Sequence, residues 1–385
     1  MKELVQRRDW LRSASLGALA YLTPSFGQSP APGVTPAGLI VRQNEPSNLE
    51  SPASALQTFI TPADRFYVRN HFNTPEIAAD SWKLKVEGAV QRPLEIGYRE
   101  LTGMPSRNQI SMLECAGNGR VFLVPKEGGV QWQSGAVSNA EWTGIPLSAV
   151  LERAGVKAGA VDVIFEGADR GEIAADPKSP GEIHFARSLP MARARTGNVL
   201  LAYKMNGADL SAAHGFPVRV VVPGWYGMAS VKWLARIVVT DKPFEGFFQT
   251  LQYSHWERPN GTPTLVPVTG MNVKTAIVSP VPDDVIPRTG PYKIKGLAWA
   301  GEASITRVEV SGDGGKTWGS AKLTGPSSRY AWRMWEYDWQ PPSAGQYSLM
   351  ARGTDSQGRT QPMERDKDHR NYEITHVIPV RVEVR

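Results

Sequence analysis

The sequence predicts an α+β domain followed by an all-β, immunoglobulin-like sandwich, and two observations support this fold class. Between residues 62 and 262, strand-like and helix-like segments mix without a βαβ repeat, a Gly-x-Gly-x-x-Gly fingerprint or a phosphate-binding P-loop. From Ala276 onward, apolar residues recur at every second position in several short segments. This period is typical of strands that pack one face against a core.

Residues 1–28 are expected to form a twin-arginine export signal. Arg7 and Arg8 precede a weakly apolar stretch rich in Ala, Gly and Leu that ends at Leu22. The alternative is an ordinary amphipathic first helix. The twin-arginine machinery exports folded proteins, so the signal predicts a periplasmic protein that binds a cofactor before export. Residues 29–61 are rich in Pro, Ser, Gly and Asn and are expected to be an extended arm.

The first domain, residues 62–262, contains few strong helix signals. Residues 98–101 are expected to form a short helical turn, and residues 146–154 a helix that ends at Gly155. Strands are expected at residues 82–88, 161–165, 218–222 and 237–240.

The second domain, residues 263–385, begins with a proline-containing linker that runs to residue 274. The segment Asp313-Gly314-Gly315 predicts a hairpin turn between two strands. Strands are expected at residues 292–299, 305–311, 332–339, 347–354 and 376–384. No cysteine is available to bridge the two sheets.

Cys115 is the only cysteine in the chain, so it cannot form an internal disulfide. It follows a short apolar run and precedes Gly117, Asn118, Gly119 and Arg120, which predicts a strand that ends in a tight loop. Such a loop lets backbone N–H groups surround a bound group, and Arg120 would favour the thiolate. The alternative is a buried, unreactive small side chain.

The formal net charge of +6 is modest, and no run of lysine or arginine exists, which argues against nucleic acid as a partner. It suits a small anionic substrate or an acidic protein. Four arginines (Arg69, Arg120, Arg219 and Arg333) lie in glycine-rich or aromatic contexts. Planar guanidinium groups bind oxyanions through paired hydrogen bonds, although a single such arginine is more often a surface or stacking residue. Only their convergence would make an anion pocket.

The chain resembles the sulfite oxidase family of mononuclear molybdenum enzymes over nearly all of residues 55–385. Outside the predicted export signal, no segment approaches the ~18 apolar residues of a membrane span. The segments that match the family occur in collinear order. They are Tyr67–His71, Glu114–Asn118, Gly135–Ser138, Leu201–Gly207, His214–Arg219, Val222–Gly224, Val231–Leu234 and Ser254–Trp256.

The resemblance implies a molybdopterin-binding catalytic domain followed by a dimerisation domain. It also implies that Cys115 is the thiolate ligand of molybdenum, a role that suits a soft sulfur donor. The residues implied to hold the pterin and its phosphate are Val68, Arg69, Asn70, His71, Phe72, Asp169, His214, Arg219, Ser230, Val231 and Lys232. The residues implied to form the substrate anion pocket are Arg69, Arg120, Trp132 and Arg333.

One departure from the family pattern concerns a tyrosine. Animal and plant members carry an active-site tyrosine shortly after the Ser-His-Trp segment, where this chain has Gly261. Tyr226 is a candidate replacement. In lacking this tyrosine, the chain also resembles the bacterial sulfane dehydrogenase branch of the family.

The resemblance implies oxidation of sulfite to sulfate by oxo transfer in a homodimer. The chain has no Cys-x-x-Cys-His motif and hence no c-type haem attachment, so electrons are expected to pass to a separate c-type cytochrome. Two other functions stay open: an enzyme acting on carrier-bound sulfane sulfur or another oxyanion, and a cofactor-free assembly or binding protein. The intact Cys115, Arg69 and Lys232 argue against the latter.

Overall fold

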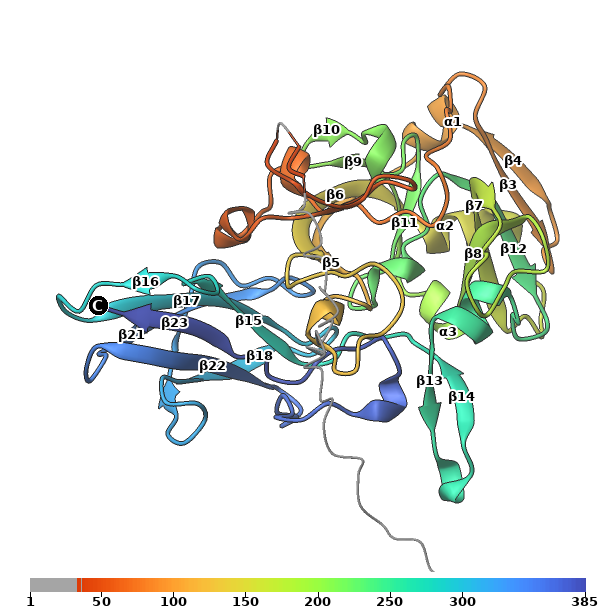
Figure 1. The fold of residues 1–385 in the computed structure, drawn as a ribbon. Helices are drawn as coiled ribbons and strands as arrows, with labels where there is room; N and C mark the ends of the chain where they lie inside the picture. Colours follow the sequence, from red (N-terminus) through yellow and green to blue (C-terminus); the bar gives the residue numbers. More distant parts are fainter. Residues whose placement is uncertain (1–32, 36) are drawn as a thin grey trace, which may run out of the picture. The chain divides into compact units, whose positions relative to one another are not determined.

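Figure 1 shows the fold in a computed structural model, which describes residues 33–35 and 37–385. The predicted export signal, residues 1–28, lies outside the described residues. Within the described part, no helix is long and apolar enough to cross a membrane. The chain from Gly33 onward forms one unit. We call residues 33–262 the catalytic half, after the role expected from the sequence, and residues 263–385 the C-terminal half, and the two halves share buried contacts.

The catalytic half is built on two five-stranded sheets. The first contains β5 (Arg107–Glu114), β6 (Val137–Pro146), β9 (Leu200–Met205), β10 (Ala208–Asp209) and β11 (Arg219–Val221), all paired antiparallel. The second contains β3 (Lys83–Gly88), β4 (Leu94–Gly97), β7 (Asp162–Gly171), β8 (Ile183–Pro190) and β12 (Leu234–Thr240). In the second sheet, β12 runs parallel to β3 and antiparallel to β7.

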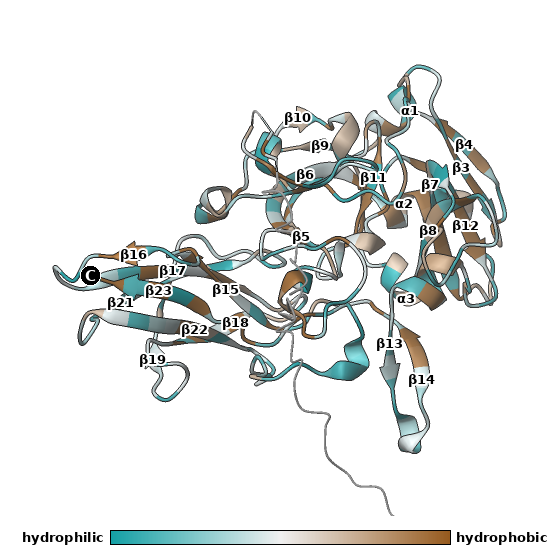
Figure 2. Ribbon diagram, in the orientation of Figure 1, coloured by the Kyte–Doolittle hydropathy of each residue, from teal (hydrophilic) through white to brown (hydrophobic). Residues whose placement is uncertain are grey.

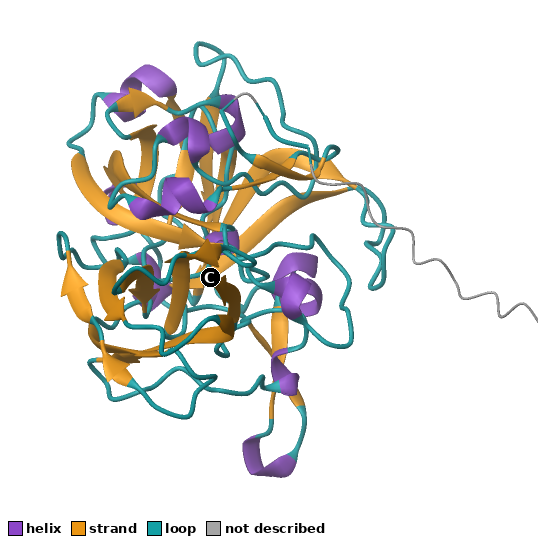
Figure 3. Cartoon of the chain, turned by 60° about the vertical axis from the view of Figure 1, so that its left-hand side comes forward, coloured by secondary structure: helices purple, strands orange, loops and turns teal. Residues whose placement is uncertain are grey.

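Helices in this half are short, as Figure 3 shows. They are α1 (Tyr98–Thr102), α2 (Leu147–Ala154) and α3 (Met191–Ala194). The longest, α2, buries Leu147, Val150 and Leu151 and ends at Gly155, whose φ of 68° is the left-handed conformation that glycine readily adopts. The helix predicted at residues 146–154 is therefore confirmed.

The α+β prediction holds only in its coarser form, because the catalytic half is mostly β. Strands β7 and β8 extend well beyond the short runs visible in the sequence, and buried and less buried residues alternate along β7. Single turns of other helix types connect the strands. Their bounds are η1 (Ala53–Gln57), η2 (Ala63–Arg65), η3 (Arg120–Phe122), η4 (Ala212–His214), η5 (Gly227–Ala229), η6 (Phe248–Gln252), η7 (Pro259–Gly261) and η8 (Lys367–His369).

Two small antiparallel pairs lie outside these two sheets. Strands β1 (Ile40–Gln43) and β2 (Asn48–Glu50) lie within the segment expected to be an extended arm. Strands β13 (Ser254–Glu257) and β14 (Thr264–Pro267) form a hairpin with η7 at its tip (Figure 1).

The C-terminal half consists of two sheets that enclose an apolar core. One sheet has β15 (Lys274–Ser279), β17 (Tyr292–Trp299), β21 (Arg333–Trp339) and β20 (Lys322–Thr324). The other has β16 (Val285–Ile286), β23 (Val380–Val384), β22 (Gly345–Asp355), β18 (Ile305–Ser311) and β19 (Gly319–Ser320). Ile294 and Trp335 from the first sheet meet Val308 and Leu349 from the second in one buried cluster.

The strands predicted in this half are confirmed, although three have other bounds: β21 begins at Arg333, β22 runs from Gly345 to Asp355, and β23 is shorter than predicted. Those at residues 292–299 and 305–311 have the predicted bounds, and the Asp313 turn links β18 to β19. Strand β23 begins only at Val380, so residues 376–379 are not strand. Figure 2 shows apolar residues on strands of both halves, and the larger buried cluster includes Trp299 and Trp332 of the C-terminal half.

Candidate active site

Cys115 lies at the end of β5, where the first sheet of the catalytic half meets the C-terminal half. Its backbone N–H donates to the Ala136 carbonyl (2.9 Å), and the residue is 6% exposed. The preceding residue, Glu114, is fully buried. One of its carboxylate oxygens accepts from Lys274 Nζ (2.9 Å), and the other accepts from the Trp299 indole N–H (2.8 Å). This buried ion pair anchors the strand end that presents the thiol.

Gly117 follows because the space above it is filled by arginine. A Cβ at Gly117 would lie 2.1 Å from Arg120 Nη2, so a side chain there would displace the Arg120 guanidinium from its place beside the loop. Arg120 in turn donates from Nη1 to the Val130 carbonyl (2.8 Å) and from Nε to the Asn371 carbonyl (3.1 Å). The tight loop predicted after Cys115 therefore places the guanidinium beside the thiol loop.

A cavity of about 830 Å³ opens beside Cys115, and four arginines line it: Arg42, Arg69, Arg120 and Arg370. Arg370 donates from Nη1 to Ser254 Oγ (2.7 Å) and to two backbone carbonyls. Arg42 pairs with Glu50, whereas Arg69, Arg120 and Arg370 form no salt bridge with a carboxylate among the described residues. The cavity, which we call the anion pocket, therefore carries uncompensated positive charge next to the only thiol.

Two tyrosines also line the anion pocket. Tyr253 and Tyr372 have ring centroids 4.9 Å apart, and the Tyr253 hydroxyl lies 2.6 Å from His71 Nε2. The Arg120 guanidinium lies 5.6 Å from the centre of the Tyr372 ring. Burial raises the pKa of both phenols above its usual value, so both hydroxyls stay protonated at neutral pH.

A second, more enclosed cavity adjoins the anion pocket, and we call it the cofactor cradle. Lys232 Nζ donates to the Ala213 carbonyl (2.9 Å) and contacts Asn70. Arg219 donates to the His214 carbonyl (3.1 Å) and the Ser230 carbonyl (3.0 Å). The predicted cofactor residues that line this cavity are Val68, Arg69, Asn70, His71, Asp169, His214, Arg219, Ser230 and Lys232.

Burial in the cradle disfavours the charged form of each ionisable group. It lowers the pKa of His214 to about 3, and it lowers the pKa of Lys232 well below its usual range. Burial also raises the pKa of Asp169 to about 7, and its Oδ1 has no hydrogen-bond partner among the described residues. Buried cations beside an unsatisfied carboxyl oxygen are costly unless a ligand joins them.

Some predicted site residues line neither cavity. Phe72 and Val231 are buried in the apolar core of the catalytic half. Trp132 is fully buried in the cluster that contains Cys115, and its indole N–H has no partner among the described residues. Tyr226 is buried as well, so the tyrosine proposed to replace the family's does not open into the pocket. Gly261 lies on η7, at the tip of the β13–β14 hairpin.

Arg333 was expected in the substrate anion pocket, and the structure places it elsewhere. It lies at the start of β21, paired with Ala298 of β17, and donates to the Pro326 carbonyl (3.0 Å). It lines neither the anion pocket nor the cradle, because its position in the strand keeps it within the C-terminal sheet. The C-terminal half instead contributes Arg370 and Tyr372, from the loop after η8.

The residues that sequence reasoning missed are Tyr253, Arg370 and Tyr372. Tyr253 directly precedes the Ser254–Trp256 segment, which was a usable signal. Arg370 and Tyr372 lie between η8 and β23, in a segment with no strand or helix period. No local pattern marked that segment as part of the pocket wall.

Comparisons with known proteins agree with this architecture. A family model described as an oxidoreductase molybdopterin binding domain matches residues 71–248, and one described as a Mo-co oxidoreductase dimerisation domain matches residues 266–373. Sulfite oxidase of Gallus gallus is 36% identical over 357 residues, which cover 87% of this chain and 76% of that protein. Mitochondrial sulfite oxidase of Homo sapiens is 37% identical over 337 residues, 81% of this chain and 58% of that protein.

A solved structure covers nearly the whole chain. The sulfane dehydrogenase SoxCD from Paracoccus pantotrophus matches with a TM-score of 0.75 and 30% identity, over 96% of this chain and 92% of that chain. Fold, site and relatives together define a molybdopterin-dependent oxidoreductase. The chain belongs to the sulfite oxidase family of molybdenum enzymes.

The residues present fit the molybdenum cofactor of this family. Arg219 and Lys232 offer cationic hydrogen-bond donors for a phosphate, and the unpartnered Asp169 carboxyl offers an acceptor for ring N–H groups. Cys115 lines both cavities and offers the soft sulfur that a molybdenum centre binds.

Proposed function

We propose that the protein oxidises sulfite, or a closely related sulfur oxyanion, at a molybdenum centre ligated by Cys115. The observation that carries the proposal is the anion pocket, where three guanidinium groups without carboxylate partners surround the mouth of the Cys115 site. Oxidation of sulfite to sulfate consumes one water and releases two protons and two electrons. The bound cofactor supplies oxygen transfer and the two-electron redox change.

The chain's own residues bind and orient the anion. Arg69, Arg120 and Arg370 would hold the dianion through charge-assisted hydrogen bonds and stabilise the charge that shifts during oxygen transfer. Their backbone carbonyl partners hold the guanidinium planes in place, so little reorganisation is needed.

Tyr253 is placed to donate a hydrogen bond in the same pocket. Its hydroxyl lies 2.6 Å from His71 Nε2, and burial lowers the pKa of His71 well below its usual value. With its proton on Nε2, a neutral His71 donates to the Tyr253 oxygen, which orients the hydroxyl and leaves the phenol proton available for the anion. We infer that this pair replaces the tyrosine that the family pattern places where this chain has Gly261.

Electrons would leave to a separate c-type cytochrome in the periplasm. The twin-arginine pattern of residues 7–12 supports the location, and the net charge of +6 supports an acidic partner. We further propose a homodimer built through the C-terminal half, supported by the match to a dimerisation domain. The two-sheet arrangement of that half supports the immunoglobulin-like assignment. The domain boundary at residues 262/263 remains part of this proposal.

A second candidate is oxidation of sulfane sulfur on a carrier. Two observations favour it: near-complete coverage of the SoxCD sulfane dehydrogenase and a wide anion pocket of about 830 Å³. A carrier arm would fill such a pocket more completely than a sulfite ion does.

The deciding experiment is sulfite-dependent reduction of ferricyanide by protein already shown to contain molybdenum. Sulfite oxidation predicts two ferricyanide reduced per sulfite consumed, because each ferricyanide accepts one electron. If molybdenum-loaded protein does not oxidise sulfite but oxidises a persulfide-bearing carrier, the second candidate function replaces the first.

Cys115→Ser tests the ligand assignment separately. The variant should keep the fold and bound pterin, because both hydroxyl and thiol fit the site, yet lose almost all turnover. Normal turnover in this variant would refute the role of Cys115. Pterin content, read by fluorescence after release, is the control for cofactor loading.

A further inference from the structure

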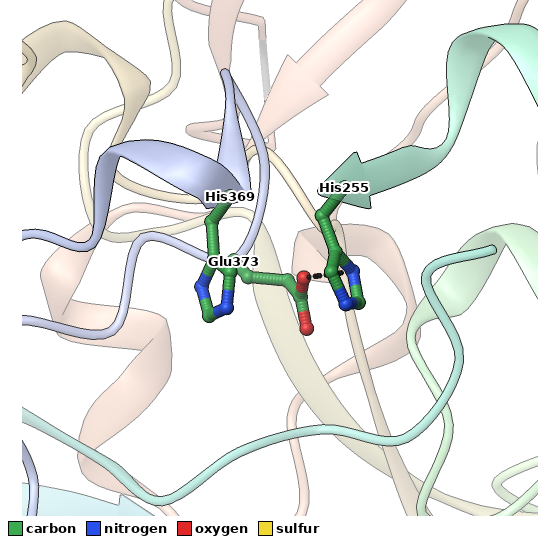
Figure 4. A group of neighbouring side chains, drawn as sticks. All are labelled: His255, His369 and Glu373. Atoms are coloured by element: carbon green, nitrogen blue, oxygen red, sulfur yellow. Dashed lines mark ion pairs between the residues drawn. The ribbon is translucent and has the colours of Figure 1, made fainter. Parts of the chain in front are cut away.

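Three potential metal ligands lie close together outside the anion pocket: His255, His369 and Glu373. One ligand atom from each lies within 4.8 Å of the other two (Figure 4). His255 comes from β13, His369 from η8, and Glu373 from the loop that follows. A cavity of about 680 Å³ adjoins them and gives solvent access.

The ion pair between Glu373 and His255 accounts for only two of the three side chains in the group (Figure 4). Glu373 Oε2 lies 2.8 Å from His255 Nδ1, but both atoms lack an aligned hydrogen-bond partner among the described residues. The Glu373 side chain is only 5% exposed, so its carboxylate is held inward. The second imidazole, that of His369, lies outside this pair, and its ring centroid is 5.2 Å from that of His255.

The surroundings favour a cation. Glu257 and Asp366 line the same cavity, at 3.6 Å from His255 Nε2 and 4.0 Å from His369 Nε2 respectively. The arginine at the cavity, Arg359, is paired with Asp355 at 2.7 Å, so its charge is compensated. The net local charge of the cavity is therefore negative.

We propose that His255, His369 and Glu373 form a second metal site, distinct from the molybdenum centre, for a divalent transition-metal ion such as Zn²⁺. Two imidazoles and one carboxylate are a ligand set that zinc accepts, with water in the fourth position. Zinc lies about 2.0–2.2 Å from such ligands, so the three atoms need only close around it by side-chain rotation. His369 is partly exposed and free to make that adjustment.

The site has a structural consequence for the anion pocket. Residues 369–373 form a wall with two sides: His369 and Glu373 face the metal cavity, while Arg370 and Tyr372 line the anion pocket. On β13 and just before it, His255 faces the metal cavity and Tyr253 the anion pocket. A metal ion would therefore tie the loop that carries Arg370 to the strand that follows Tyr253.

Two residues of this loop have backbone conformations that their surroundings must hold in place. Arg370 and Glu373 both adopt positive φ, at 55° and 49°. Non-glycine residues hold this conformation only where their surroundings constrain them. The Glu373 backbone N–H also donates to the Ala116 carbonyl (2.7 Å), one residue from Cys115.

The test uses molybdenum-loaded protein dialysed against a chelator and then titrated with Zn²⁺ or Co²⁺ alone. We expect one zinc per chain by elemental analysis after gel filtration, a rise in Tm, and visible d–d absorption with Co²⁺. His369→Gln should weaken binding at least tenfold, since even the loss of a residue that only supports a ligand costs about 10–100-fold. Glu373→Gln should do the same.

The matched control is His184→Gln, an exposed histidine on β8 outside the group. It should leave zinc affinity unchanged. His369→Gln is the safer variant because Glu373 is buried and its replacement could disturb folding. Equal zinc affinity in the wild-type protein and His369→Gln would overturn the proposal, as would no retained zinc in the wild-type protein.

A second readout separates this site from the proposed reaction. If zinc orders the wall, chelation should raise the KM of the oxyanion substrate without loss of molybdenum, and the Tm should fall even in protein that turns over no substrate. Failure of the sulfite proposal would leave the zinc stoichiometry and Tm shift intact.

Discussion

At the scale of single residues, the molecule concentrates its unusual chemistry around one thiol. Cys115, Arg69 and Arg120 were predicted from short contiguous motifs, and the structure brings all three to one cavity. A contiguous motif defines its local backbone, so the residue positions follow from the sequence. Arg333 was assigned to the pocket by the resemblance to the family, and its aromatic neighbours reflect packing in β21 and carry no information about the distant pocket.

The assignment of Arg370, rather than Arg333, to the anion pocket can be tested by measuring the KM of variants. Arg370→Gln should raise the KM of the oxyanion at least tenfold, because it removes a charged donor from a partly desolvated pocket. Arg333→Gln is the matched control and should leave the KM unchanged, since Arg333 donates to a backbone carbonyl outside the pocket. Steady-state kinetics in which the two variants behave alike would remove Arg370 from substrate binding.

His214 provides a prediction about pH. The cofactor-free folded protein holds His214 neutral with a pKa of about 3, whereas the unfolded chain takes up a proton near pH 6.5. Protons therefore favour the unfolded state between these two values, and stability falls as the pH drops below 6.5. The contribution is about 1.4 kcal/mol per pH unit.

Thermal unfolding of the cofactor-free wild-type protein and His214→Gln between pH 4 and 6 isolates this contribution. The wild-type Tm should fall more steeply with decreasing pH than that of the variant, which cannot be protonated. Parallel slopes would mean that His214 is already accessible to protons in the folded protein.

At the scale of elements, the two halves are joined by charge as well as by apolar packing. Glu114 ends β5, Lys274 begins β15 and Trp299 ends β17, and their side chains meet in one buried group. Lys274 also donates to the Asn118 carbonyl (2.8 Å), inside the loop after Cys115. The C-terminal half thus supports the shape of the thiol loop from behind.

Lys274→Met should destabilise the protein by about 3–5 kcal/mol, because it leaves the buried Glu114 carboxylate without its cation. Molybdenum content should fall with it, since the loop after Cys115 loses a support. Lys293→Met removes a lysine from an exposed pair with Asp338 and should leave the Tm unchanged. A Lys274→Met protein with wild-type Tm and full molybdenum would show that the buried pair contributes neither stability nor positioning.

Sequence reasoning recovered the elements unevenly. The strands of the C-terminal half, such as β17 and β18, were predicted to the residue because one face is buried and the other is not, which gives a clear period of two. In the catalytic half, β11 was predicted within the buried run 218–222, whereas β9, which is also buried along most of its length, lacks that period and was not predicted. The two helical segments predicted there, at residues 98–101 and 146–154, are both present as α1 and α2.

At the scale of the whole molecule, the cofactor cradle is assembled from segments that lie far apart in the sequence. Residues 66–71, Cys115, Asp169, Arg219 and Tyr253 all line it, although more than 180 residues separate the first from the last. Such a cavity exists only after the catalytic half has folded. Cofactor insertion therefore requires the folded chain, which fits an export route that carries folded proteins.

The predicted twin-arginine signal supplies the last test. Replacing Arg7 and Arg8 with lysine conserves charge but removes the paired guanidinium groups, so the protein should stay in the cytoplasm of its host with its cofactor loaded and residues 1–28 uncleaved. Arg12→Lys, a change outside the pair, is the matched control and should be exported normally. Cell fractionation, with molybdenum measured in each fraction, distinguishes the outcomes. Normal periplasmic accumulation of the double-lysine protein would mean that this segment is an amphipathic helix or uses another export route, and the periplasmic cytochrome would then lose its main support as the electron acceptor.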